Sequence, residues 1–211
     1  MLNKKARICV FVSGGGTNLQ ALIDAQNSGI IKNGEIVLVL SSNREAYALE
    51  RAKKADIPGV YVVKKEFASQ LDFENKVIDI LNENEIDLIV LAGFMTILTE
   101  HFTSKYPKRI INVHPALIPS FCGKGFYGLH VHEAALSYGV KVSGATVHFV
   151  TAECDGGPII LQKAVEVLDD DTPETLQRRI MEQAEWKILP KAVALLCDDK
   201  IEVKDGKTYI K

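Results

Sequence analysis

Short apolar runs alternate with helical repeats through the first half of this chain, and this alternation constrains the fold more than any other feature. Residues 7–12, 35–41, 60–63 and 87–92 are apolar runs rich in β-branched residues, as expected of strands buried on both faces. Between them, apolar residues recur at helical spacing, at Leu19, Leu22 and Ile23 and again at Phe73, Val77, Ile80 and Leu81. The pattern predicts an α/β fold with a doubly wound, mostly parallel Rossmann-like sheet flanked by helices.

The second half changes character. Residues 109–114 form a further expected strand that ends in polar residues. Residues 145–150 and 158–167 are two strand-like runs joined by a short glycine-containing loop, which predicts an antiparallel hairpin. The tail, 200–211, predicts a strand pair around an Asp-Gly turn. Because no repeat or linker interrupts the 211 residues, we expect one domain spanning 1–211.

The last long helix is expected to begin after Thr172. Thr172 is a good N-cap residue and Pro173 suits the first helical position. Position N3 holds Thr175 rather than Glu or Gln, so we expect no full capping box.

The charge and cysteine content exclude several classes of protein. Lys and Arg number 25 against 27 Asp and Glu, giving a net charge of −2, which argues against nucleic-acid binding by phosphate neutralisation alone. The four cysteines show no CxxC spacing, so the sequence predicts neither a zinc knuckle nor a redox pair. The chain shows no signal peptide or membrane span, and we expect a cytoplasmic protein with reduced thiols and no membrane partner.

The glycine loop at 13–18 follows the first expected strand. Consecutive glycines let the backbone approach a ligand, and the helix that follows offers free N–H groups to an anion. The loop lacks the GK[ST] of a Walker motif, and Leu19 stands at the third glycine position of GxGxxG. A tight turn without ligand is one alternative, but Thr17 and Asn18 add side-chain donors and favour a monophosphate site beside Gly16.

Asn112 and His114 stand at the end of an expected strand. Residues two apart point to the same side of a strand, so an amide and an imidazole lie together there. An amide can stabilise a developing oxyanion and an imidazole can move a proton, which suits acyl transfer. The alternative is a structural histidine hydrogen-bonded within a loop.

Asp155 opens the Asp-Gly-Gly-Pro segment and supplies a candidate partner for His114. Its carboxylate can favour the protonated imidazole and orient the ring, although an ordinary hairpin turn also explains the segment. His148 either lines the same cleft or is simply half-buried. His130 and His132 have no carboxylate at metal-ligand spacing, so we expect no metal site.

Four segments together carry a family resemblance. They are SGGGTNLQA (13–21), VLAGFM (90–95), NVHPALIPSF (112–121) and VHFV…DGGPII (147–160). Through them the chain resembles the folate-dependent phosphoribosylglycinamide formyltransferases of purine biosynthesis, from about residue 7 to about residue 197. The resemblance implies formyl transfer from 10-formyltetrahydrofolate to the amine of 5-phosphoribosylglycinamide. It also implies a phosphate-binding half, 1–100, and a catalytic and folate-binding half, 101–211.

The resemblance assigns roles residue by residue. The catalytic residues are Asn112, protonated His114 and Asp155, acting by direct attack through a tetrahedral intermediate without a metal. The ribonucleotide site comprises Gly16, Thr17, Asn18 and Glu185. The folate site comprises Gln70, Met95, Thr96, Ile97, Leu98 and Asn112.

The chain departs from the family's pattern at three positions. Thr96 and Gln70 stand where some members have Arg near the glutamate end of the folate, and Trp186 replaces a frequent His. These departures leave open how the glutamate end is held. The loop at 122–130 is long, and we expect Lys124 in it to be solvated.

Three other functions remain as alternatives. A formyltetrahydrofolate hydrolase usually carries an additional N-terminal domain, for which the first strand near residue 7 leaves no room. A transfer-RNA formyltransferase usually adds a basic C-terminal domain. A non-catalytic nucleotide-binding module needs the glycine loop but not Asn112, His114 and Asp155. We expect small-molecule substrates only, and a monomer or a homodimer.

Overall fold

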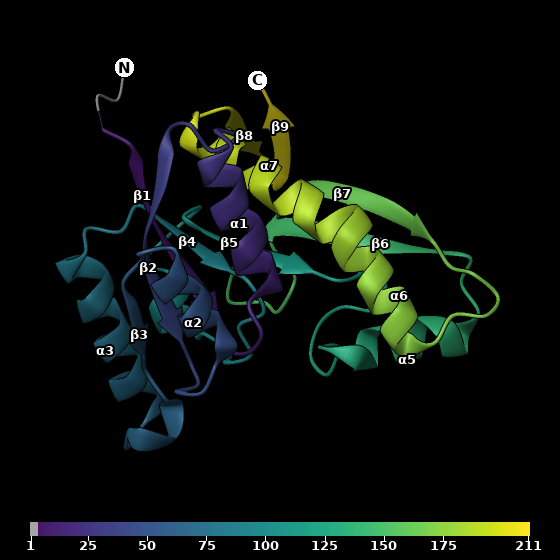
Figure 1. Cartoon of the computed structure of the whole chain (residues 1–211), viewed down its shortest axis with the longest axis horizontal. Coiled ribbons are helices and arrows are strands. Elements are labelled where there is room, and N and C mark those ends of the chain that lie inside the picture. Colours follow the sequence, from purple (N-terminus) through teal and green to yellow (C-terminus); the bar gives the residue numbers. More distant parts are fainter. Residues whose placement is uncertain (1–3) are drawn as a thin grey trace.

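Seven strands form one central sheet in the computed structural model, which describes residues 4–211. Their order across the sheet is β3-β2-β1-β4-β5-β6-β7 (Figure 1). Pairing is parallel from β3 to β5 and antiparallel at β6 and β7. The sheet strands are β1 (Ala6–Val12), β2 (Gly34–Ser41), β3 (Gly59–Tyr61), β4 (Leu88–Leu91), β5 (Ile110–His114), β6 (Val142–Phe149) and β7 (Ile159–Glu166). The predicted doubly wound sheet and its antiparallel hairpin are confirmed.

Helices connect the strands and cover both faces of the sheet. They are α1 (Thr17–Asn27), α2 (Tyr47–Lys54), the 3-10 turn η1 (Lys64–Glu66), α3 (Gln70–Glu83), α4 (Glu100–Thr103), α5 (Leu129–Tyr138), α6 (Pro173–Ile180), the π-helical turn η2 (Met181–Glu185) and α7 (Trp186–Cys197). A separate two-stranded sheet, β8 (Ile201–Lys204) with β9 (Lys207–Ile210), forms the predicted pair in the tail. No helix within residues 4–211 combines the length and the apolar character needed to cross a bilayer.

Strand β1 shows why the sheet needs cover on both sides. Ile8 and Val10 join a core with α1 and α7, which lie side by side on one face (Figure 1). Cys9 and Phe11 point the other way and pack with residues of α3 and α4. Successive side chains of a strand face opposite sides, so a continuous apolar run buries itself only between two helical layers.

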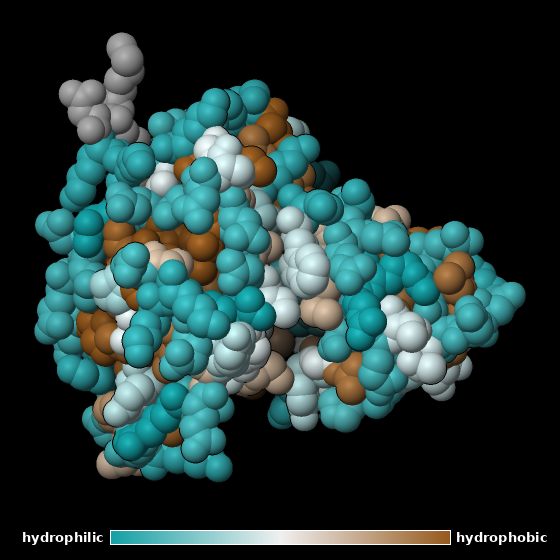
Figure 2. Space-filling view, in the orientation of Figure 1, coloured by the Kyte–Doolittle hydropathy of each residue, from teal (hydrophilic) through white to brown (hydrophobic). Residues whose placement is uncertain are grey.

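The outer surface of the helices is polar, as such packing requires. On the face shown in Figure 2, most of the surface is hydrophilic and hydrophobic residues show only in patches. The apolar sides of these helices therefore contribute to the two cores.

The start of α6 corrects one expectation. Thr172 caps the helix by accepting from the Thr175 N–H at 3.3 Å, and Thr175 Oγ1 accepts from the Thr172 N–H at 2.9 Å. A full capping box is therefore present. In most capping boxes a Glu or Gln side chain at N3 accepts from the N-cap N–H. Here the shorter Thr175 hydroxyl accepts instead, because the Thr172 N–H lies within its reach.

Candidate active site

Strand pairing brings the predicted catalytic segment together with β6. Asn112 lies directly opposite His148, and His114 opposite Thr146, in the antiparallel register of β5 and β6. Residues opposite one another share a face of the sheet, so these four side chains project to the same side. The amide Nδ2 of Asn112 lies 3.2 Å from Nε2 of His148.

The loop between β6 and β7 delivers Asp155 to the same place. Its Oδ2 lies 3.6 Å from Nδ1 of His114, and its Oδ1 lies 3.5 Å from Nε2 of His148. The backbone N–H of Gly123 also donates to Oδ2, at 2.8 Å. The structure thus brings Asn112, His114 and Asp155 together, although they come from two separate segments of the chain.

Backbone geometry explains the Asp-Gly-Gly sequence. Asp155 has a φ of +55°, a left-handed conformation that Asp tolerates better than most residues. A Cβ at Gly157 would overlap the carbonyl oxygen of Phe149. The loop can therefore pass this close to the end of β6 only with glycine at position 157.

The protonation of His114 follows from its contacts. Nε2 lies 2.8 Å from the carbonyl oxygen of Phe121, which can only accept, so Nε2 carries a proton and Nδ1 of the neutral ring is free to take one. Burial lowers the pKa of His114, and this outweighs the opposing effect of Asp155. The resting imidazole is therefore neutral near pH 7, and the protonated His114 expected to act on the developing oxygen stays a prediction for the reacting site.

Asp155 stays ionised beside this neutral ring. Burial opposes its ionisation, but the contact with His148, the Gly123 N–H and the charge of His114 outweigh burial and lower the pKa of Asp155 to about 2. A carboxylate fixed next to the free nitrogen of an imidazole stabilises the imidazolium once a proton arrives.

The glycine loop meets the π-helical turn η2. Asn18 Nδ2 donates to Glu185 Oε2 at 2.6 Å, and Thr17 Oγ1 donates to Met181 Sδ at 3.7 Å. Burial raises the pKa of Glu185 to about 7, with the Asn18 hydrogen bond acting in the opposite direction. The predicted ribonucleotide residues therefore come from two segments, 16–18 and 181–185, that contact each other in the fold. Short π-helical turns are common at functional sites.

Gly16 shows that the glycine loop is shaped by close packing. Its φ is +72°, and an added Cβ would lie 2.6 Å from the Cβ of Ala48. Arg51 Nε donates to the Gly15 carbonyl at 2.8 Å, so a side chain of α2 holds the backbone of the loop. The first N–H groups of α1 have no partner within the helix, and no acidic residue stands in its first turn.

The predicted folate residues fall into two groups. Met95, Thr96 and Ile97 line a cavity of about 650 Å³, whereas Leu98 is buried in the core with α3 and α4. Gln70 does not line this cavity: its Nε2 donates to Glu74 Oε1 at 2.7 Å and to the Ile97 carbonyl at 3.1 Å.

Three groups at or next to the site were not assigned from the sequence. His148 was left undecided between a cleft residue and a half-buried one, and the β5–β6 register is the signal that places it. The Gly123 N–H depends on loop geometry that sequence does not encode locally. Glu74 is fully buried and accepts from Gln70, from the Thr99 N–H and from Thr99 Oγ1, each at 2.7 Å, so it anchors the 95–99 loop.

No three His, Cys, Asp or Glu side chains of residues 4–211 are grouped so that they could hold a metal ion. The site residues are instead two imidazoles, one amide and one carboxylate. These are groups for hydrogen bonding and proton transfer.

Comparisons with known proteins show what the chain is similar to. The formyl transferase family profile matches residues 6–193. Phosphoribosylglycinamide formyltransferase of Haemophilus influenzae is 39% identical over 97% of this chain and 93% of its own, and that of Escherichia coli is 37% identical over 96% and 92%. The structure of glycinamide ribonucleotide transformylase 1 from Symbiobacterium toebii superimposes with a TM-score of 0.92 at 40% identity, covering 98% of this chain and 94% of that one.

A hydrolytic relative is more distant. A formyltetrahydrofolate deformylase from Pseudomonas syringae has a TM-score of 0.85 at 26% identity, and the chain covers 66% of it. With a family profile that spans nearly all of its length and relatives similar from end to end, this chain belongs to the formyl transferase family.

Proposed function

We propose that the protein transfers a formyl group from 10-formyltetrahydrofolate to the amine of 5-phosphoribosylglycinamide, a step of purine biosynthesis. Full-length similarity to enzymes with that name supports the choice of substrates. The observation that carries the chemistry is a chain of short contacts: Asn112 Nδ2 lies 3.2 Å from His148 Nε2, and the Asp155 carboxylate lies 3.5 Å from His148 Nε2 and 3.6 Å from His114 Nδ1.

The reaction needs an oxyanion donor and a proton carrier. The amine nitrogen attacks the formyl carbon, and the carbonyl oxygen becomes negative in a tetrahedral intermediate. Asn112 Nδ2 has two hydrogens, one directed to His148 and one left for that oxygen. Losing one such donor typically costs about 2.7–4 kcal/mol in the barrier.

Protons are then redistributed. The attacking amine becomes positively charged and loses a proton, and the folate nitrogen must gain one as its bond to the formyl carbon breaks. His114 accepts through Nδ1 and becomes an imidazolium stabilised by Asp155, then returns the proton to the leaving nitrogen. No covalent bond to the enzyme forms, and holding both substrates in register supplies much of the remaining rate.

The substrates bind on the two sides of this centre. The phosphate of the ribonucleotide lies at the N-terminus of α1 beside Gly16, Thr17 and Asn18, with Glu185 toward the glycinamide portion. Met95 to Ile97 and the 151–156 loop border the folate, and Leu98 packs in the core behind them. Gln70 acts on the folate through the Ile97 carbonyl, which it holds in place.

One assay tests the proposal. The protein is mixed with 10-formyltetrahydrofolate, with and without 5-phosphoribosylglycinamide, and tetrahydrofolate release is followed. Release that depends on the amine is expected. Release without the amine indicates a hydrolase, and no release in either case indicates a binding module. His114→Ala should abolish turnover in a folded protein, and near-normal turnover of that variant would contradict the assigned roles.

A further inference from the structure

Two cysteines that are distant in the sequence lie on segments that meet beside Asp155. Cys122 belongs to the segment between β5 and α5, and Cys154 to the loop between β6 and β7. The Gly123 N–H donates to Asp155 Oδ2 at 2.8 Å, and the Cys154 thiol donates to the same oxygen at 3.8 Å. One carboxylate oxygen therefore contacts both the Cys154 side chain and the residue that follows Cys122.

Both of these cysteines are free thiols that solvent can reach. Cys154 is exposed and Cys122 is half-buried, whereas Cys9 is fully buried in β1. Partial burial of its sulfur, the charge and hydrogen bond of Asp155 and the neighbouring Cys122 all raise the pKa of the Cys154 thiol, so each thiol lies within the electrostatic reach of the other. The sequence has no CxxC spacing, and only the fold brings this pair together.

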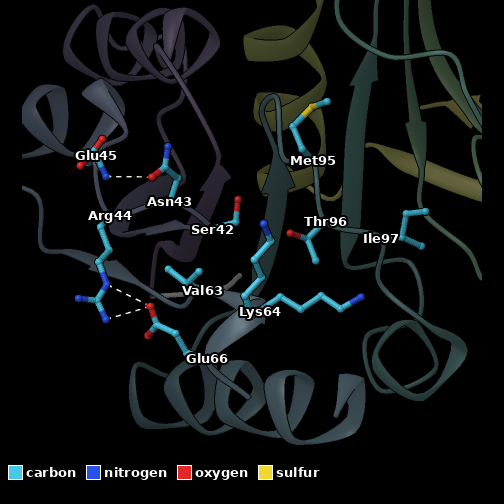
Figure 3. Close-up of a pocket in the computed structure, with 11 residues that line it drawn as sticks. Ser42, Asn43, Arg44, Glu45, Val63, Lys64, Glu66, Met95, Thr96 and Ile97 are labelled. Carbon is cyan, nitrogen blue, oxygen red and sulfur yellow. Dashed lines mark hydrogen bonds and ion pairs between the residues drawn. The ribbon is translucent and has the colours of Figure 1, made fainter. Parts of the chain in front are cut away.

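The two segments also hold the proton-transfer pair of the proposed reaction. The Phe121 carbonyl lies 2.8 Å from His114 Nε2, and Asp155 Oδ2 lies 3.6 Å from His114 Nδ1. A covalent link between the segments would therefore act on both partners of that pair. This place shares no residue with the cavity in Figure 3, whose lining comes from residues 42–45, 63–66 and 95–97.

We propose that Cys122 and Cys154 form a reversible disulfide in the presence of a peroxide, and that this bond lowers the rate of formyl transfer. The more exposed Cys154 reacts first: its thiolate attacks a peroxide oxygen, the O–O bond breaks, and a sulfenic acid forms as hydroxide leaves. The Cys122 thiolate then attacks the Cys154 sulfur, and the S–O bond breaks as a second hydroxide leaves. The thiol protons convert both hydroxides to water, and the two electrons that the sulfurs lose reduce the peroxide.

The bond would displace the groups around His114. A disulfide holds its sulfurs about 2.05 Å apart and its Cβ atoms about 3.5–4.5 Å apart, so both thiols must turn away from their present acceptors, Asp155 Oδ2 and the Pro119 carbonyl. The backbone beside each cysteine follows, and the Asp155 carboxylate shifts relative to His114. A displacement of about 1 Å can lower the rate about 100-fold.

The Asp155 carboxylate also limits how fast the thiols react. Burial is the larger effect, and the charge of Asp155 adds to it, in raising the pKa of both Cys122 and Cys154. Because the thiolate is the reactive form, disulfide formation should be slow at pH 7 and faster toward pH 9. Asp155→Asn removes the charge and should speed up the reaction at pH 7.

Peptide mapping tests the bond itself. The reduced protein is treated with hydrogen peroxide, its remaining thiols are blocked with N-ethylmaleimide in denaturant, and the digested peptides are analysed by mass spectrometry. We expect one linked pair, Cys122 with Cys154, and blocked thiols at Cys9 and Cys197. A different pair, or no linked pair, would overturn the proposal.

Turnover tests the consequence. Oxidation should lower the turnover of the wild type about 10- to 100-fold, and dithiothreitol should restore it. The double variant C122S/C154S should keep the activity of its own reduced form, and Cys197→Ser, a matched control with both loop cysteines in place, should respond as the wild type does. Only the loss that dithiothreitol reverses is compared, because oxidised methionines need their own reductases. Unchanged turnover of the oxidised wild type, or an equal loss in the double variant, would contradict the proposal.

The effect on turnover rests on the proposed function, but formation of the bond does not. If the reduced wild type transfers no formyl group, the proposed function fails, and peptide mapping still tests the disulfide. If the reduced wild type is active and mapping finds no bond between Cys122 and Cys154, only the disulfide fails.

Discussion

Asn112 on β5 lies opposite His148 on β6, and the Asn112 amide nitrogen is 3.2 Å from His148 Nε2. His148 is 1% exposed and its Nδ1 donates to the Phe149 carbonyl at 2.8 Å, which fixes the ring. A fixed ring in turn fixes the amide. His148 is thus a positioning residue for Asn112, and it also lies beside Asp155.

Replacing His148 with Ala should therefore lower kcat by about 10- to 100-fold, the value of one hydrogen bond to a group that acts on charge. The KM values for both substrates should stay near those of the wild type, because His148 acts through Asn112. Steady-state kinetics at pH 7 measure kcat and KM separately. His130→Ala removes an exposed histidine and should change neither; a His148→Ala variant with wild-type kcat would contradict the positioning role.

Asp155→Asn should shift the acid limb of kcat/KM, which steady-state kinetics between pH 5 and pH 8 measure. The charge of Asp155 raises the pKa of His114 against the larger effect of burial, so its removal lowers that pKa further below 6.5. Since His114 must be neutral to accept a proton, the acid limb of kcat/KM should move to lower pH. The rate at the optimum should fall by about 10²-fold or more, because the imidazolium loses its counter-charge. A limb that stays in place would show that another group sets it.

Glu185 should make stability fall as pH rises. Its pKa is about 7 in the folded protein against 4.5 ordinarily, so the folded state binds the proton more tightly. The stabilisation is full below pH 4.5 and is lost as pH rises through 7. Relative to Glu185→Gln, which does not titrate, the wild type should lose roughly 2.5 kcal/mol of unfolding free energy between pH 5 and pH 8. Urea unfolding of both proteins across that range measures the difference, and parallel curves would exclude a raised pKa.

Gly16→Ala should weaken both the fold and the phosphate site. The left-handed backbone at Gly16 costs a residue with a Cβ about 1–2 kcal/mol, and the new atom would press on Ala48. We expect a lower unfolding midpoint and a higher KM for 5-phosphoribosylglycinamide. Gly15→Ala is the control, because nothing lies within 4 Å of its Cβ position and its φ is not positive. Equal effects of the two substitutions would show that the close contact with Ala48 does not matter.

Local sequence determined much of this protein. The alternation of buried runs with helical repeats predicts the parallel sheet, since period and burial are properties of neighbouring residues. The glycine loop, Asn112 with His114, and the Asp-Gly-Gly turn are likewise visible as short segments. Their meeting at one catalytic centre was expected through the family resemblance rather than from spacing.

Only the tertiary structure decided how those segments act together. The β5–β6 register places His148 against Asn112, and a loop brings Asp155 to both histidines. Burial then makes His114 neutral and turns Glu185 into a group that titrates near pH 7. These properties depend on distances and on exclusion of water, which residues far apart in the sequence create together, so no local pattern encodes them.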